Sequence, residues 1–277
     1  MTLDTLQTGG FKPNGDEPKG IPQISLVVPC YNEEDGLRIM VHRLWEAMRI
    51  HQLSVELVLV DNGSKDGTGS EIETLMGEGF PIRKVTVVEN QGYGYGVLRG
   101  LEACTGDYVG FLCADEQVEA SDVARMCYKA VRSRNPRLYK IYRRFRMESF
   151  SRRVVSNLYN FLTNAIFGNL GSGDLNGNPK IFPRSYYNQM QLRSTDWFLD
   201  AEVMIKAKML ELPVFEVNVF SQMRAEGQSN VKPSTCLEFL NNLFYYRWGA
   251  GKALMEIGES NPQLPHTGMT PGKANQK

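Results

Sequence analysis

Three polar segments of this chain each follow directly on an apolar run that is typical of a buried strand. The segments are Cys30–Glu34 after Ile24–Pro29, Asp61–Thr68 after Val55–Val60, and Cys113–Gln117 after Asp107–Leu112. In an open parallel sheet the carboxyl ends of the strands share one edge, and ligands bind in the crevice outside it. We therefore expect the carboxylates and amides of these distant segments to meet in one ligand-binding cleft.

The third segment carries the pattern of a cation site. Asp115 and Gln117 stand two residues apart at a strand end, which points both oxygen-bearing side chains to one face. Oxygen ligands suit Mg²⁺ or Mn²⁺, and Glu116 is a further oxygen donor, whereas the thiol of Cys113 is a poor ligand for a hard cation. We expect Asp115 and Gln117 to bind the cation; the alternative is a polar strand end without metal.

The first two segments also have a simpler interpretation. In it, Asn32 caps the following helix, Glu33 complements the dipole in the first helical turn, and Asp61–Thr68 is an ordinary turn. A turn alone does not explain why Asp61 ends an apolar strand. A carboxylate there can accept hydrogen bonds from a nucleobase, so both interpretations stay open.

Strands and helices alternate through the first half of the chain, which predicts βαβ units. The expected strands are 24–29, 55–60, 83–88 and 108–112, and the expected helices are 35–51, 69–76, 92–105 and 120–133. In the second half we expect helices over 148–167, 201–210 and 236–257, and strands over 179–182 and 214–220. The predicted fold class is α/β: a Rossmann-like, mainly parallel central sheet flanked by helices, with a C-terminal helical extension.

Composition divides the chain into four predicted parts. Residues 1–20 are expected to be a flexible arm, 21–232 the main domain, 233–258 an aromatic amphipathic helix, and 259–277 a disordered tail. The aromatic helix has two interpretations. It packs against the core or a second copy of the chain, or it lies at a membrane surface with its Trp and Tyr at headgroup depth. A homo-oligomer is left open.

Charge and cysteine usage exclude several classes of protein. The 277 residues carry 31 basic and 31 acidic side chains, so no overall signal indicates nucleic-acid binding. Five cysteines without CxxC spacing indicate reduced thiols and a cytoplasmic protein, and three histidines argue against a zinc site. We expect neither a signal peptide nor a transmembrane helix.

Ten Lys or Arg nevertheless crowd residues 129–153, which suggests a phosphate-bearing acceptor or an anionic membrane surface.

The order of these motifs resembles the family 2 glycosyltransferases with the GT-A fold, and within them the dolichyl- and polyprenyl-phosphate sugar transferases. The resemblance covers residues 23–232. The chain departs from the family pattern in three places. Asn62 replaces the second of two consecutive Asp residues, Cys113 replaces the first Asp of the Asp-x-Asp motif, and the residues 177–180 replace the usual Gly-Phe-Arg portion. The resemblance implies a nucleotide diphosphate sugar, from UDP or GDP, as the donor and Mg²⁺ or Mn²⁺ as the cofactor.

The resemblance also assigns roles residue by residue. The implied nucleotide and donor contacts are Pro29, Tyr31, Glu33, Asp61, Gly92, Asp115, Asp174 and Ser229, with Asp115 and Gln117 holding the cation. The implied contacts of the acceptor phosphate are Arg143, Arg144, Arg152 and Ser156. The implied catalytic residues are Asp115, Asp200 and Arg224, where Arg224 stabilises the departing diphosphate and Asp200 lies on the acceptor side.

The function that follows is inverting transfer of a sugar to a polyprenyl-phosphate acceptor, by a protein that associates peripherally with a membrane during cell-surface glycan synthesis. Two alternatives remain. In the first, the acceptor is a sugar hydroxyl of a growing polysaccharide, and Asp200 is the general base. In the second, the departures at Asn62 and Cys113 mark a protein that binds nucleotide sugars without catalysis.

Overall fold

The computed structural model describes residues 21–114, 118–146, 150–221 and 233–249. Its strands are β1 (Ile24–Cys30), β2 (Val55–Asn62), β3 (Ile82–Val87), β4 (Tyr108–Phe111), β5 (Leu138–Arg146), β6 (Lys180–Pro183) and β7 (Val214–Ser221). Its helices are α1 (Glu34–Ile50), α2 (Thr68–Gly77), α3 (Tyr93–Ala103), α4 (Ala120–Arg132), α5 (Phe150–Phe167), α6 (Arg184–Met190), α7 (Leu199–Met209) and α8 (Pro233–Trp248). The predicted arm and tail, and the end of the aromatic helix, lie outside the described residues.

The seven described strands form one mixed sheet in the order β3-β2-β1-β4-β6-β5-β7. The pairs β1–β2, β1–β4, β2–β3 and β5–β7 are parallel, whereas β6 runs antiparallel to both β4 and β5. The prediction of a mainly parallel α/β sheet flanked by helices is therefore confirmed. Two elements were missed, the strand β5 inside the basic stretch and the short helix α6.

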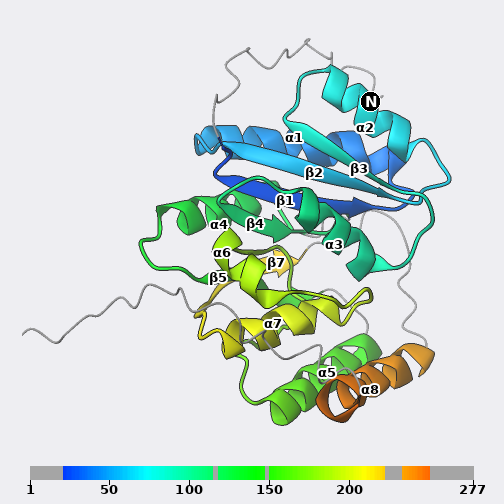
Figure 1. Ribbon diagram of the computed structural model, residues 1–277, viewed down its shortest axis with the longest axis vertical. Helices are drawn as coiled ribbons and strands as arrows, with labels where there is room; N and C mark the ends of the chain where they lie inside the picture. Colours follow the sequence, from blue (N-terminus) through cyan, green and yellow to red (C-terminus); the bar gives the residue numbers. More distant parts are fainter. Residues whose placement is uncertain (1–20, 115–117, 147–149, 222–232, 250–277) are drawn as a thin grey trace, which may run out of the picture.

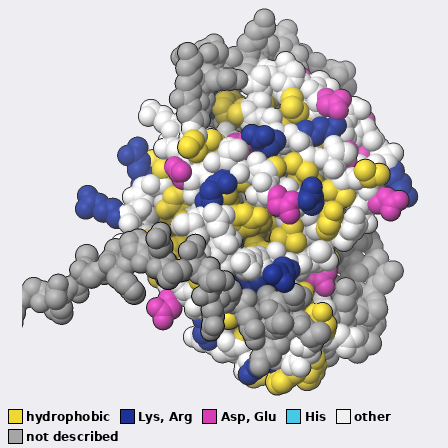
Figure 2. Space-filling model, in the orientation of Figure 1, with side chains coloured by type: hydrophobic (Ala, Val, Ile, Leu, Met, Phe, Trp, Pro, Cys, Tyr) yellow, Lys and Arg dark blue, Asp and Glu magenta, His cyan; other side chains and the backbone are white. Residues whose placement is uncertain are grey.

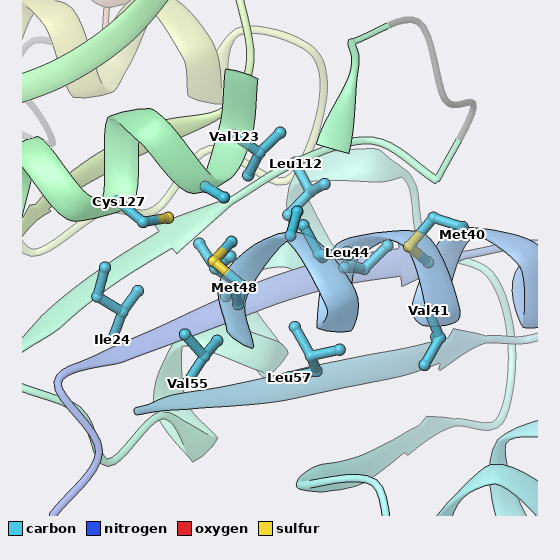
Figure 3. Packing of buried hydrophobic residues seen from close by; sticks show 14 of the residues in the cluster. Ile24, Met40, Val41, Leu44, Met48, Val55, Leu57, Leu112, Val123 and Cys127 are labelled. Carbon is cyan, nitrogen blue, oxygen red and sulfur yellow. The ribbon is translucent and has the colours of Figure 1, made fainter. Parts of the chain in front are cut away.

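Two apolar cores lie on opposite faces of this sheet. In Figure 1, α1 lies behind the sheet and α3 in front of it. Alternation along β1 divides its side chains between the faces, since Leu26 and Val28 belong to one core and Val27 to the other. Figure 3 shows the first core, in which Leu44 and Met48 of α1 pack against the strands and α4.

The helix α7 is buried along nearly its whole length, from Leu199 to Ala207. It carries three charged residues into the second core, and each has a partner of opposite charge. Asp200 pairs with Lys180 of β6, and Glu202 pairs with Lys206 one turn later at 2.9 Å. Pairing is what makes such burial tolerable, because an isolated buried charge is strongly destabilising.

At the lower end of the molecule in Figure 1, α5 and α8 lie side by side. Within the part of the chain that the structure describes, no helix combines the length and the apolar character needed to cross a bilayer.

Candidate functional site

The carboxyl ends of β1, β2 and β4 lie at one edge of the sheet. Parallel pairing sets Pro29, which is half-buried, beside Val60 and sets Cys30 beside Asp61, while β4 runs parallel on the other side of β1. The strand order runs outward in both directions from β1 and β4, and ligands of open α/β sheets bind at such a reversal. The sheet therefore brings the start of all three polar segments to the edge where a ligand is expected.

The loops after β1 and β2 are fastened to each other. The backbone N–H of Lys65 donates to Oδ1 of Asn32 at 2.8 Å, and the backbone N–H of Glu33 donates to Oγ1 of Thr68 at 2.9 Å. The described start of α1 has no side-chain cap, so the interpretation of Asn32 as a helix cap is wrong. Asn32 instead adopts a left-handed backbone, φ 56°, and joins the two loops into one rim.

Two predicted ligand-binding carboxylates meet in this rim. Burial raises the pKa of the Cys30 thiol, and the nearby carboxylates of Glu33 and Asp61 raise it further, which places both acids around the end of β1. The backbone N–H of Ser64 donates to Oδ1 of Asp61 at 3.1 Å. The ring of Tyr31 is 43% exposed beside them, as a stacking surface would require. Their roles toward a nucleotide stay predictions.

The glycines before and within the first turn of α3 pack closely against other residues of the chain. A Cβ on Gly92 would lie 2.8 Å from the carbonyl oxygen of Thr195, and one on Gly96 would lie 2.9 Å from the side chain of Asn62. Nδ2 of Asn62 donates to the carbonyl oxygen of Gly92 at 3.1 Å, a bond that an Asp could not donate. The departure at Asn62 is thus explained by its bond to the α3 turn, and the expected contact of Gly92 with a nucleotide stays a prediction.

Cys113, just after β4, lies in a group of polar side chains drawn from four parts of the chain. Nδ2 of Asn178 lies 3.0 Å from the hydroxyl of Tyr93 and 3.9 Å from Sγ of Cys113. Nζ of Lys180 donates to Oδ1 of Asn178 at 3.2 Å and forms an ion pair with Asp200. Burial, and then the charge of Asp200, raise the pKa of Tyr93 well above its ordinary value, so its hydroxyl keeps its proton.

This group changes the interpretation of Asp200. Its carboxylate is buried, 1% exposed, and Lys180 beside it is fully buried. A general base must reach the proton that it removes. The geometry therefore favours Asp200 as an orienting charge rather than as a base. Sequence reasoning missed Tyr93, Asn178 and Lys180 as members of this group, and the one signal for Lys180 was a charged residue inside an apolar strand.

The predicted donor contact Asp174 and the predicted acceptor contact Arg143 bind each other. Nε and Nη2 of Arg143 donate to the two carboxylate oxygens of Asp174 at 2.9 and 3.0 Å. The loop that carries Asp174 is held by Lys140, whose Nζ lies 3.0 Å from Oγ of Ser172 and 2.8 Å from Oε1 of Glu216. Burial lowers the pKa of Lys140 to about 8. The two predicted contacts thus form one unit of the site.

The described members of the basic stretch have different environments and do not form one cationic surface. Among its described members, Lys140 is fully buried and Arg143 is paired with Asp174. Nζ of Lys129 lies over the ring of Phe215, and the guanidinium of Arg132 lies over the ring of Tyr128. The predicted contact of this stretch with an acceptor phosphate or an anionic membrane surface stays a prediction.

Several predicted residues cannot be placed. Asp115, Gln117, Arg224 and Ser229 lie outside the described residues, and so do the side chains of Arg144 and Arg152. Ser156 of α5 is half-buried. Among the described residues, no three His, Cys, Asp or Glu side chains gather as a metal site would require. The predicted cation ligands Asp115 and Gln117 lie in the segment 115–117, outside the described residues, and stay predictions.

Comparison with known proteins bears on this arrangement. Residues 25–190 match the pattern of "Glycosyl transferase family 2". The chain is 33% identical over 115 residues to an undecaprenyl-phosphate 4-deoxy-4-formamido-L-arabinose transferase of Pseudomonas fluorescens, covering 41% of this chain and 34% of the relative. A transferase of the same name from Aeromonas hydrophila is 30% identical over 141 residues, covering 50% of this chain and 43% of the relative. The match thus spans less than half the length of these curated relatives.

Solved structures show the same fold at low sequence identity. Glucosyl-3-phosphoglycerate synthase from Mycobacterium tuberculosis, crystallised with Mn²⁺, UDP and glucosyl-3-phosphoglycerate, has a TM-score of 0.62 at 18% identity, with 82% of this chain and 80% of that chain covered. A mycobacterial protein of unstated function has a TM-score of 0.63 at 20% identity, with 82% of this chain and 75% of that chain covered.

Proposed function

This chain belongs to glycosyl transferase family 2, and we propose that it transfers a sugar from a nucleotide diphosphate sugar to a polyprenyl-phosphate acceptor, inverting the anomeric carbon. The observation that carries the proposal is the convergence of Tyr31, Glu33, Asp61 and Cys113 at the edge where β1, β2 and β4 end. The names of the curated relatives, which are undecaprenyl-phosphate sugar transferases, support the acceptor.

The rim formed by the loops after β1 and β2 is the proposed nucleotide site. Tyr31 presents a half-exposed ring for the base, Glu33 has a carboxylate for ribose hydroxyls, and Asp61 has one for N–H groups of the base. Because the two loops are bonded to each other, these groups are positioned before a ligand arrives, which lowers the entropic cost of binding.

The proposed cation site adjoins Cys113. Asp115 and Gln117 would hold Mg²⁺ or Mn²⁺, and the bound cation would offset the charge of the leaving diphosphate. In the described part of this site, Asn178 and Tyr93 surround Cys113 with neutral groups that can donate hydrogen bonds. The thiol of Cys113 is a weak ligand for a hard cation, so the proposed site depends on the oxygen atoms of Asp115 and Gln117.

The burial of Asp200 supports a phosphate as the acceptor. A lipid phosphate is already ionised at neutral pH, so its oxygen can attack the anomeric carbon without a base, while the bond from that carbon to the diphosphate breaks. A sugar hydroxyl would need a base to take its proton, and Asp200 is buried against Lys180. Alignment of the two reactants then supplies part of the rate enhancement. The proposed contacts of the acceptor phosphate are Arg143, Arg144, Arg152 and Ser156, and Arg224 and Ser229 are proposed to close on the diphosphate.

We also propose that 21–232 forms the transferase domain and that 233–258 continues it as an extension resting on a membrane surface. On α5 and α8 the structure exposes large apolar side chains, here called the α5/α8 apolar surface: Leu158, Phe161, Phe244, Tyr245 and Trp248. Figure 2 shows apolar side chains at the lower end of the molecule, where α5 and α8 lie in Figure 1. Aromatic side chains of this kind bind at headgroup depth, which would bring the enzyme to its lipid acceptor.

The test is a transfer assay with matched variants. Purified protein is incubated with a panel of UDP- and GDP-sugars, Mg²⁺ or Mn²⁺, and either undecaprenyl phosphate or soluble oligosaccharides. We expect transfer to the lipid phosphate alone. Tyr31→Ala should weaken nucleotide binding, while Tyr128→Ala, which removes a similarly exposed ring on α4, should not. Transfer only to oligosaccharides would replace the proposed acceptor by a sugar hydroxyl, and binding without turnover would indicate a non-catalytic protein.

A further inference from the structure

A stacked pair of aromatic rings lies next to the group around Cys113. The rings of Tyr93, at the start of α3, and Trp197, just before α7, are nearly parallel, with centroids 4.4 Å apart and an interplanar angle of 11°. Trp197 is nonetheless 49% exposed. A tryptophan that is stacked on one face and half-exposed overall offers a large apolar surface at little further entropic cost, since its orientation is already fixed.

The segment carrying Trp197 is held from two sides. On the α3 side, the backbone N–H of Tyr95 donates to the carbonyl oxygen of Thr195 at 2.9 Å. On the α8 side, Nδ2 of Asn242 donates to Oδ2 of Asp196 at 2.8 Å, while Oδ1 of Asp196 accepts from the backbone N–H of Phe198 at 2.8 Å. The exposed ring therefore stands on a fixed segment and not on a free loop.

The stack is joined directly to the proposed donor site. The hydroxyl of Tyr93 lies 3.0 Å from Nδ2 of Asn178, and this amide also faces Sγ of Cys113. Cys113 stands two residues before Asp115, a proposed ligand of the cation that holds the diphosphate. The sugar of the donor is attached to that diphosphate, so the proposed function brings the sugar to this side of the site.

The charged side chains nearest the stack already have partners within the protein. Lys180 is paired with Asp200, and Asp196 accepts hydrogen bonds on both carboxylate oxygens. The base of the nucleotide has its own proposed site at Tyr31 and Asp61, at the ends of β1 and β2. The part of the donor that suits the exposed indole of Trp197 is therefore the sugar, whose ring has an apolar face.

We propose that Trp197, backed by Tyr93, is a platform on which the C–H face of a pyranose ring stacks, and that it sets the specificity for the sugar. The inference rests on the proposed function, because it takes the ring from the donor. Apolar and aromatic surfaces with a few fixed polar groups are the usual composition of small-molecule sites. Removal of the ring should therefore affect the sugar part of the donor and leave the nucleotide part unaffected.

The experiment compares binding of a nucleotide sugar with binding of the matching nucleoside diphosphate. UDP-glucose and UDP, or the tightest-bound pair from a panel of UDP- and GDP-sugars, are titrated by calorimetry with Mn²⁺ present. Trp197→Ala should weaken binding of the nucleotide sugar about 3- to 10-fold, the scale of an aromatic stacking contact, and leave UDP unchanged. Trp197→Phe should retain most of the affinity. Tyr128→Ala is the control for loss of an exposed ring, and unchanged UDP binding shows that the variants are folded.

The outcomes separate this inference from the proposed function. If donor binding is unchanged in Trp197→Ala but the KM of an oligosaccharide acceptor rises, the proposed contact with the donor sugar is overturned, and so is the lipid phosphate as the acceptor. Equal losses for UDP and UDP-glucose, or no change in any of these measurements, overturn the platform and leave the transferase proposal standing. A wild-type protein that binds no nucleotide sugar overturns both.

Discussion

The ion pair between Lys180 and Asp200 offers the sharpest test of how this site works. Both side chains are buried, with Lys180 fully so and Asp200 1% exposed, and they join β6 to α7. Replacing Lys180 by Met leaves a carboxylate in the core without its cation. We expect the free energy of unfolding to fall by about 3–5 kcal/mol, the scale for one orphaned partner of a buried pair.

The double variant Lys180→Met/Asp200→Asn should be more stable than either single variant. It removes both charges, so the remaining cost is a buried amide with fewer hydrogen bonds, about 1–3 kcal/mol. Urea unfolding followed by circular dichroism measures all three variants, and a double-mutant cycle gives the coupling. Losses below about 1 kcal/mol in both single variants would contradict the burial of the pair.

Activity of the same double variant distinguishes the two roles of Asp200. If Asp200 orients its surroundings only through its ion pair with Lys180, which joins β6 to α7, the double variant regains much of the transfer to a lipid phosphate along with its stability. If Asp200 is a general base, stability returns and activity does not, since Asn cannot take a proton. That second result would refute the interpretation of Asp200 as an orienting charge and favour a hydroxyl acceptor.

Three further predictions concern neighbouring features. The pKa of Lys140 is about 8 in the folded protein and 10.5 ordinarily, so the unfolded chain binds more protons between these two pH values. The free energy of unfolding should therefore rise with pH in this range, by up to about 1.4 kcal/mol per pH unit. Denaturant titrations from pH 8 to 9.5 should show this slope in the wild type and not in Lys140→Met. Cys113→Asp should tighten Mn²⁺ binding about tenfold in the presence of UDP, measured by calorimetry, because it supplies a hard oxygen ligand; unchanged affinity would place residue 113 away from the cation. Gly94→Ala should destabilise the fold by about 1–3 kcal/mol in urea unfolding, because its Cβ would lie 2.5 Å from the carbonyl oxygen of Ser194, whereas Gly77→Ala, with nothing within 4 Å, should not destabilise it.

Local patterns were sufficient for the first half of the sheet. The strands β1 to β4 and the helices between them fall within a few residues of their predicted bounds. The reason is that apolar runs and helical spacing are patterns of residues close together in the sequence. The same logic placed Tyr31, Glu33 and Asp61 at one edge, since parallel strands must end together.

Local patterns failed where charged residues have distant partners. The strand β5 lies within a stretch whose sequence is strongly basic. The residues that neutralise Lys140 and Arg143, Glu216 and Asp174, lie 76 and 31 residues further along the chain. Nothing near Lys140 in the sequence indicates that it will be buried. A buried charge is tolerated only when a partner of opposite charge lies beside it, and folding is what brings these distant residues together.

The α/β class, the family and the edge of the sheet that carries the site follow from the sequence, because these depend on periodicity and on the order of motifs. The environment of each group depends on the folded chain. The tertiary structure pairs Asp200 with Lys180, places Asn62 against α3, and stacks Trp197 on Tyr93. Accessibility, charge pairing and stacking depend on distances between residues far apart in the chain, and those distances exist only in the folded molecule.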